Sequence, residues 1–100
     1  MEEDTSVLLW AAEEGDVPIL DLHGMRGVEA RHVLESFLHH HYLQGERVVR
    51  IVHGRGDGIL RQEVHHLLSH IHFVDQFQDA THPALVGAVT VALFYSSQSK

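Results

Sequence analysis

The 100-residue sequence predicts one α/β domain with the element order β-α-β-α-β-β. Three observations lead to this fold class. Short runs of β-branched and aromatic residues, which are typical of strands, alternate with two segments whose apolar residues recur every three or four positions. Glycine and proline residues separate these segments. The length is sufficient for one stable core, and no second domain fits within it.

The chain is expected to begin with a short helix over residues 5–14. Asp4 or Thr5 is a suitable N-cap residue, and Gly15 stands just past the end of the pattern. A proline-containing loop follows, because proline has no N–H group to donate within a sheet. The apolar run over residues 19–22 then predicts the first strand.

Residues 28–42 carry the clearest helical pattern, with apolar side chains on one face and charged or histidine side chains mostly elsewhere. A Gln-Gly pair ends this helix, and the β-branched residues of segment 47–52 predict the second strand. A glycine-rich loop follows. Beyond it, from about Gly58, a second amphipathic helix is expected, with apolar residues between Leu60 and Ile71.

Two further strands are expected over residues 73–79 and 88–95, separated by a turn that contains proline and glycine. In the first of them, alternation places Phe73, Asp75 and Phe77 on one face. Strand-helix-strand units place their strands parallel, so the first three strands should run in one direction. The last strand, reached by a short turn, should run antiparallel to them.

Composition and charge restrict the classes of function. The chain has no cysteine, which excludes disulfides and thiolate zinc sites, and any metal would need His, Asp or Glu ligands. The acidic start and the short apolar run after it fit neither a secretory signal nor a membrane span, so a soluble, cytoplasmic protein is expected. The net charge of −7 disfavours a broad nucleic-acid clamp, but all six arginines lie between residues 26 and 61.

Two strands end in the same dipeptide, at His23-Gly24 and at His53-Gly54. Ligands of open α/β sheets bind at the carboxyl ends of parallel strands, so both endings are expected to form one site. Asp21 and His23 are two residues apart on a strand and should face the same side, where the carboxylate can orient the imidazole or share a metal with it. His53 is the second ionisable ring expected at this site. For one of the two rings, His23 or His53, a structural hydrogen bond to a loop carbonyl is the alternative to catalysis.

The glycine-rich loop after the second strand is suited to binding a phosphate group. Glycines leave backbone N–H groups accessible, and the next helix directs its positive N-terminal end to the same place. Two arginines could add guanidinium contacts. The candidate phosphate-binding residues are Gly54, Arg55, Gly56, Gly58 and Arg61.

The segments Leu20-Asp21-Leu22-His23-Gly24 and His53-Gly54-Arg55-Gly56-Asp57-Gly58-Ile59-Leu60-Arg61, followed by Gly87-Ala88-Val89-Thr90, resemble the Smr domain, the small MutS-related domain, in content and order. The resemblance covers residues 18–95. It leaves 1–17 as an N-terminal extension and 96–100 as a frayed tail. It implies a two-layer α+β sandwich with a mixed four-stranded sheet and two main helices, similar to the C-terminal domain of translation initiation factor 3.

The resemblance further implies an endonuclease that either cleaves RNA or nicks DNA in repair. Some members of the family act on RNA at ribosomes, in ribosome rescue. It assigns catalysis to Asp21 and His23 and substrate binding to the loop from His53 to Gly56. No cofactor is required by the sequence; Mg²⁺ or Mn²⁺ held by Asp21 and His23 is the option for a DNA substrate. The expected partners are RNA or DNA and the ribosome, with no membrane.

Two other functions are alternatives to the endonuclease hypothesis. One is a nucleic-acid-binding or ribosome-binding module without catalysis, which the acidic net charge and the absence of a basic stretch before Gly87 favour. The other is a histidine-based metal protein that uses the run His39-His40-His41 with His32, or the pair His66 and His70 at helical spacing. A solvated, histidine-rich helix surface is the simpler interpretation of those residues.

Overall fold

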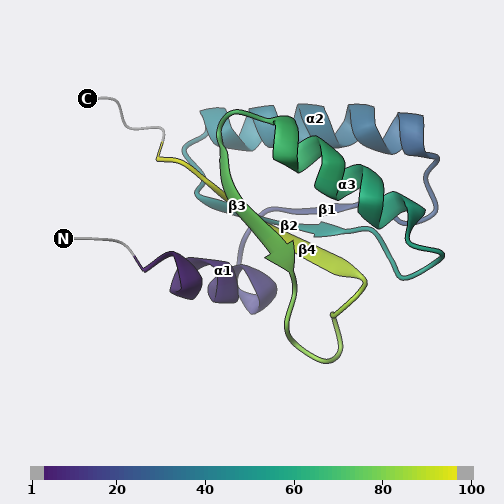
Figure 1. Ribbon diagram of the computed structural model, residues 1–100. Coiled ribbons are helices and arrows are strands. Elements are labelled where there is room, and N and C mark those ends of the chain that lie inside the picture. Colours follow the sequence, from purple (N-terminus) through teal and green to yellow (C-terminus); the bar gives the residue numbers. More distant parts are fainter. Residues whose placement is uncertain (1–3, 97–100) are drawn as a thin grey trace.

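A computed structural model describes residues 4–96 of the chain. The described part is a four-stranded sheet with helices on both faces (Figure 1). Of the proposed C-terminal tail, residues 97–100 lie outside the described residues, as do residues 1–3 of the N-terminal extension. The elements are α1 Thr5–Glu14, β1 Ile19–Asp21, α2 Gly27–Leu43, β2 Val48–Val52, α3 Ile59–His70, β3 Val74–Asp79 and β4 Val89–Phe94.

The sheet has the strand order β1-β2-β4-β3. β1 and β2 pair in parallel, and β4 is antiparallel to both of its neighbours, β2 and β3. The predicted strand directions are therefore confirmed: the first three strands point one way and the last one points back. Because Asp21 is in register with Val52, the carboxyl ends of β1 and β2 lie level with each other. The two His-Gly endings consequently leave the same edge of the sheet.

Helices α2 and α3 cover one face of the sheet (Figure 1). Their spacing of apolar residues places Leu34 and Leu38 of α2 and Val64 and Leu68 of α3 in one buried cluster with residues of the sheet. The α/β fold class with a mixed four-stranded sheet is as the sequence predicts. The long helix α2 begins one residue earlier and ends one residue later than its pattern indicates.

Helix α1 covers the centre of the opposite face (Figure 1). Leu9 and Ala12 of α1 are buried against Val91 and Leu93 of β4, which lies buried along its whole length. Arg50 of β2 also donates hydrogen bonds to the carbonyl groups that end α1. The predicted short helix is therefore present, and it adds a partial third layer to the expected two.

None of the helices within residues 4–96 has the length and apolar character needed to cross a lipid bilayer.

Candidate active site

Asp21 and His23 form a hydrogen-bonded pair at the carboxyl end of β1. Oδ1 of Asp21 lies 2.6 Å from Nδ1 of His23 and also accepts a hydrogen bond of 3.0 Å from the backbone N–H of His23. Leu22 between them is fully buried, whereas both polar side chains are more than half exposed. The two side chains lie together as predicted, although β1 ends at Asp21 and the hydrogen bonds form in the turn that follows the strand. The hydrogen bond from the ring of His23, followed by the bond from its backbone, lowers the pKa of Asp21.

The hydrogen bond between Asp21 and His23 determines which ring nitrogen of His23 is available to a ligand. An ionised carboxylate only accepts hydrogen bonds, so Nδ1 of His23 carries the proton and donates a hydrogen bond to Asp21. Nε2 then holds the lone pair of the neutral ring. Among residues 4–96, no group bonds to Nε2. The ring is therefore oriented as a proton acceptor that faces solvent, which is the arrangement of a histidine paired with a carboxylate in general-base catalysis.

The glycine-rich loop after β2 packs directly on His23. A Cβ atom added to Gly54 would lie 3.2 Å from Cβ of His23, so the loop approaches this closely because Gly54 has no side chain. The backbone N–H groups of His53 and Gly54 both donate to the carbonyl of Ala88 at 3.0 Å. The two His-Gly segments therefore meet, as predicted, and the second one is anchored to the start of β4.

An open cavity of about 420 Å³ lies between the loop after β1 and the loop after β2. Both loops contribute backbone from glycine residues to its wall, so a ligand could reach main-chain N–H groups there. The lining residues are Gly24, Met25, Arg26, Gly27, His53, Gly56, Asp57, Ile59 and Leu60. Arg26, which the sequence analysis did not select, is an exposed cation at this cavity and stands at the N-terminus of α2.

The candidate phosphate-binding groups differ in how available they are. Both oxygens of Asp79 accept hydrogen bonds from Arg61, at 2.9 Å and 2.6 Å, and these bonds raise the pKa of the guanidinium. Oδ1 of Asp57 accepts from the N–H of Ile59, so one donor at the start of α3 is already used. Gly58, in the left-handed conformation with φ of 86°, is the N-cap residue of α3. Arg55 is exposed and donates one bond to the carbonyl of Ala84.

His53 occupies a different environment from His23. Its side chain is almost wholly buried, and burial lowers the pKa of its ring. Nδ1 lies 3.0 Å from the carbonyl of Gly54, which can only accept, so Nδ1 carries the proton. Nε2 lies 2.9 Å from Oγ1 of Thr90 and accepts from that hydroxyl. Both ring nitrogens thus have partners, and the bond to the loop carbonyl is the structural role that the sequence left open for one of the two histidines.

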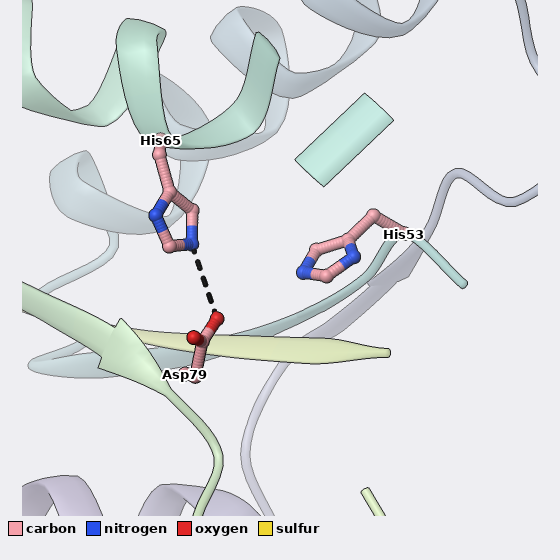
Figure 2. A group of neighbouring side chains, drawn as sticks. All are labelled: His53, His65 and Asp79. Atoms are coloured by element: carbon pink, nitrogen blue, oxygen red, sulfur yellow. Dashed lines mark ion pairs between the residues drawn. The ribbon is translucent and has the colours of Figure 1, made fainter. Parts of the chain in front are cut away.

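Thr90 connects His53 to a second histidine that the sequence analysis did not select. Nε2 of His65, on α3, lies 2.8 Å from Oγ1 of Thr90 and 3.5 Å from Oδ1 of Asp79. Figure 2 shows the rings of His53 and His65 and the carboxylate of Asp79 directed toward a common centre. Burial also lowers the pKa of His65. One signal in the sequence was available: Arg61 and His65 are four residues apart and therefore share a face of α3.

The histidines that the sequence offered for a metal site are arranged differently. The rings of His66 and His70 lie 4.5 Å apart, but both side chains are exposed and Nδ1 of His70 bonds to the carbonyl of His66. Within the described range 4–96, the group of three metal-type ligands is His53, His65 and Asp79, and it includes none of the histidines that the sequence offered as metal ligands.

Comparisons with known proteins agree on one family. The model of the Smr domain matches residues 20–94. "Endonuclease MutS2" of Carboxydothermus hydrogenoformans is 41% identical over 61 residues, which are 61% of this chain and 8% of that protein. "Endonuclease MutS2" of Borreliella burgdorferi is 37% identical over 65 residues, which are 65% of this chain and again 8% of that protein. The matches therefore span less than a tenth of the length of these curated relatives.

Two solved structures are similar to the chain. The crystal structure of the Smr domain of Thermus thermophilus MutS2 superposes with a TM-score of 0.75 at 31% identity, covering 79% of this chain and 99% of that one. YdaL, a stand-alone small MutS-related protein from Escherichia coli, superposes with a TM-score of 0.76 at 22% identity, covering 94% of this chain and 79% of that one. At this lower identity, the second likeness concerns the fold alone.

Proposed function

The chain belongs to the Smr domain family, and from this premise we propose that it is an endonuclease that cleaves the phosphodiester backbone of RNA or nicks that of DNA. The observation that carries the proposal is the pair of Asp21 and His23, exposed at the end of β1 and in contact with the glycine-rich loop. Support comes from relatives named endonucleases, although the chain spans only a small part of their length.

With RNA as substrate, the proposed reaction needs no metal. Nε2 of His23 takes the proton of a 2′-hydroxyl, whose oxygen attacks the neighbouring phosphorus. The bond from phosphorus to the 5′-oxygen breaks, the leaving oxygen takes up a proton from a second acid or from water, and a cyclic phosphate forms. Asp21 keeps the ring in the required tautomer and stabilises its protonated form.

The loop after β2 is proposed to hold the phosphate. The backbone N–H of Gly56 and the start of α3 at Gly58 present partial positive charge there, and Arg55 supplies a guanidinium for the charge that develops on phosphorus. Gly54 contributes by shaping the loop, because its own N–H already donates to the carbonyl of Ala88. Arg61 would contribute only after leaving Asp79. His53, included with Asp21 and His23 in the candidate catalytic group, acts in this proposal by fixing the carbonyl of Gly54 and thereby the course of the loop.

With DNA as substrate, no 2′-hydroxyl is available and water must attack. A divalent ion such as Mg²⁺ or Mn²⁺ would supply an activated water molecule, and Nε2 of His23 would hold the ion. Asp21 accepts from Nδ1 on the other side of the ring, so its carboxylate would join as a ligand only after that hydrogen bond breaks. Both groups are exposed and adjacent, which fits an ion that keeps most of its water ligands and also binds the substrate phosphate.

The experiment compares cleavage of structured RNA and of nicked duplex DNA, each with and without EDTA. We expect product from the wild-type chain and a loss on the order of 100-fold or more in His23→Ala. His32→Ala removes an exposed histidine on α2 and is the matched control, which should cleave like the wild type. Equal cleavage by the wild type and His23→Ala would show that His23 is not a catalytic residue.

A non-catalytic module that binds nucleic acid or the ribosome is the second candidate. The net charge of −7 and the engagement of Arg61 by Asp79 favour it, because both weaken the attraction for phosphates. This candidate predicts that Asp21→Ala still shifts RNA or ribosomes in a binding assay and that no product forms with any divalent ion. It also requires that Arg55→Ala combined with Arg61→Ala abolish binding.

A further inference from the structure

Three side chains of metal-binding type converge behind the glycine-rich loop. His53 extends from the end of β2, His65 from α3 and Asp79 from the end of β3 (Figure 2). Their nearest ligand atoms all lie within 4.8 Å of one another. In a tetrahedral zinc site the ligand atoms are roughly 3.4 Å apart, since each is about 2.0–2.1 Å from the ion. The separation of 3.5 Å between Nε2 of His65 and Oδ1 of Asp79 already meets this requirement.

The orientation of His53 matches that of a metal ligand. Histidines that bind metals usually donate the N–H of the other ring nitrogen to a carbonyl or carboxylate, which fixes the ring and its tautomer. Nδ1 of His53 donates to the carbonyl of Gly54 in this manner, so the lone pair of Nε2 is directed to the cluster.

We propose that Nε2 of His53, Nε2 of His65 and a carboxylate oxygen of Asp79 bind one Zn²⁺ ion, with water as the fourth ligand. Two imidazoles and one carboxylate around an open fourth position are a ligand set that proteins use for zinc. The hydroxyl of Thr90 now donates to Nε2 of His53 at 2.9 Å and accepts from the N–H at Nε2 of His65 at 2.8 Å. Zinc binding therefore requires the proton of His65 to move to Nδ1, and the Thr90 hydroxyl is then free to hydrogen-bond to the bound water. This site is separate from the pair Asp21 and His23, and it does not depend on the proposed cleavage.

Arg61 already binds the carboxylate that the proposed zinc ion needs. Its guanidinium holds both oxygens of Asp79, so Zn²⁺ competes with Arg61 for the same carboxylate and is repelled by its charge. Removing this competitor should tighten zinc binding. A set of exposed surface histidines would show no such response, because Arg61 contacts none of them in the described structure.

A bound ion would join three separate elements to the loop that carries the candidate phosphate site. The ion would hold the ends of β2 and β3 to α3, and His53 would pass that restraint to the carbonyl of Gly54. Gly54 in turn lies against Cβ of His23. Zinc is therefore expected to stabilise the fold and to order the glycine-rich loop.

The test is calorimetric titration of Zn²⁺ into the chain after EDTA treatment and dialysis, without a histidine tag. We expect one tight site per chain in the wild type and affinity weaker by tenfold or more in His65→Gln and in Asp79→Asn. Arg61→Gln should bind more tightly than the wild type. The matched control is the double variant His66→Gln with His70→Gln, on the exposed side of α3, which should keep the tight site.

A measurement on the wild type alone avoids any dependence on how the variants fold. In ¹⁵N-histidine NMR spectra, Zn²⁺ at one equivalent should shift the ring signals of His53 and His65 before those of the exposed histidines. Equal zinc affinity in the wild type and His65→Gln, or first shifts at His66 and His70, would overturn the proposal.

Discussion

A Cβ atom at Gly54 would lie 3.2 Å from Cβ of His23, so the glycine-rich loop lies against the base of the candidate catalytic side chain. The contact joins segments that are thirty residues apart in the chain. It is possible because β1 and β2 are parallel neighbours whose carboxyl ends are level. The first His-Gly segment thus presents the ring, and the second supports it from one side.

Gly54→Ala tests this contact. Gly54 has φ of 78°, where alanine is strained by about 1–2 kcal/mol, and the new methyl group would also press on His23. We expect a lower free energy of unfolding in urea and a further loss of cleavage at temperatures where the variant is fully folded. The reason for the second loss is displacement of the ring from Asp21.

Gly45→Ala is the matched control for that variant. Gly45 has φ of 88° just after α2, and a Cβ atom there meets nothing within 4 Å. It should lower stability by the backbone strain alone, about 1–2 kcal/mol, and leave cleavage by the folded protein unchanged. If both variants cleave equally well, the contact between Gly54 and His23 has no role in positioning the ring.

Leu9→Ala tests whether α1 is an integral part of the domain. Leu9 is 2% exposed and packs on β4, so its truncation should lower the free energy of unfolding by about 2–5 kcal/mol. Trp10→Ala, one position along and 65% exposed, should change it by less than about 0.5 kcal/mol. Thermal and urea unfolding measure both. A near-neutral Leu9→Ala would mean that residues 1–17 are an accessory extension.

The helices and strands are predicted correctly because their sequence patterns depend on residues close together in the chain. Helical spacing and β-branched runs depend on neighbours in the chain, so the elements fall within about two residues of their predicted bounds. The pairing of Asp21 with His23 is equally local, because the two residues are two positions apart at the end of β1 and in the turn after it. The parallel order of β1 and β2 follows from the general rule for strand-helix-strand units.

Contacts between distant segments could not be predicted in this way. Alternation in segment 73–79 does not reveal the shift of register between Val74 and Gln76, because that depends on the pairing of β3 with β4. His65 and Asp79 each look like ordinary solvated residues of a helix and a strand. They become a cluster with His53 only when β3 and α3 are placed beside the end of β2.

Glu13→Gln tests a carboxylate that is 2% exposed at the end of α1. Burial alone would raise its pKa, but hydrogen bonds from both N–H and hydroxyl of Thr81 and from the N–H of His82 outweigh burial, so the pKa of Glu13 is lowered. The unfolded chain then takes up the proton at higher pH than the folded chain does. The ionised Glu13 therefore stabilises the fold fully above the pKa of a glutamate in the unfolded chain, about 4.3. This stabilisation is lost as the pH falls through the lower pKa of Glu13 in the folded chain.

Urea unfolding as a function of pH measures this effect. At pH 7, Glu13→Gln should be less stable than the wild type by about 1–3 kcal/mol, since the amide cannot accept all three bonds. The difference should shrink below about pH 4.3, where the wild type loses its advantage. Glu14→Gln, at the exposed neighbour, should follow the wild type. Parallel pH profiles for Glu13→Gln and the wild type would rule out this role.

Arg55 and Arg61 are expected to contribute unequally to nucleic-acid binding, although both belong to the glycine-rich loop and the helix after it. Arg61 is held by two bonds to Asp79, whereas Arg55 is exposed and donates one bond to a carbonyl of the loop before β4. A phosphate can therefore reach Arg55 without breaking an ion pair. Arg55→Gln should weaken RNA binding at every sequence and reduce the slope of log affinity against log salt by about 1. Arg61→Gln should change that slope much less, and a larger effect of Arg61→Gln would mean that its pair with Asp79 opens when nucleic acid binds.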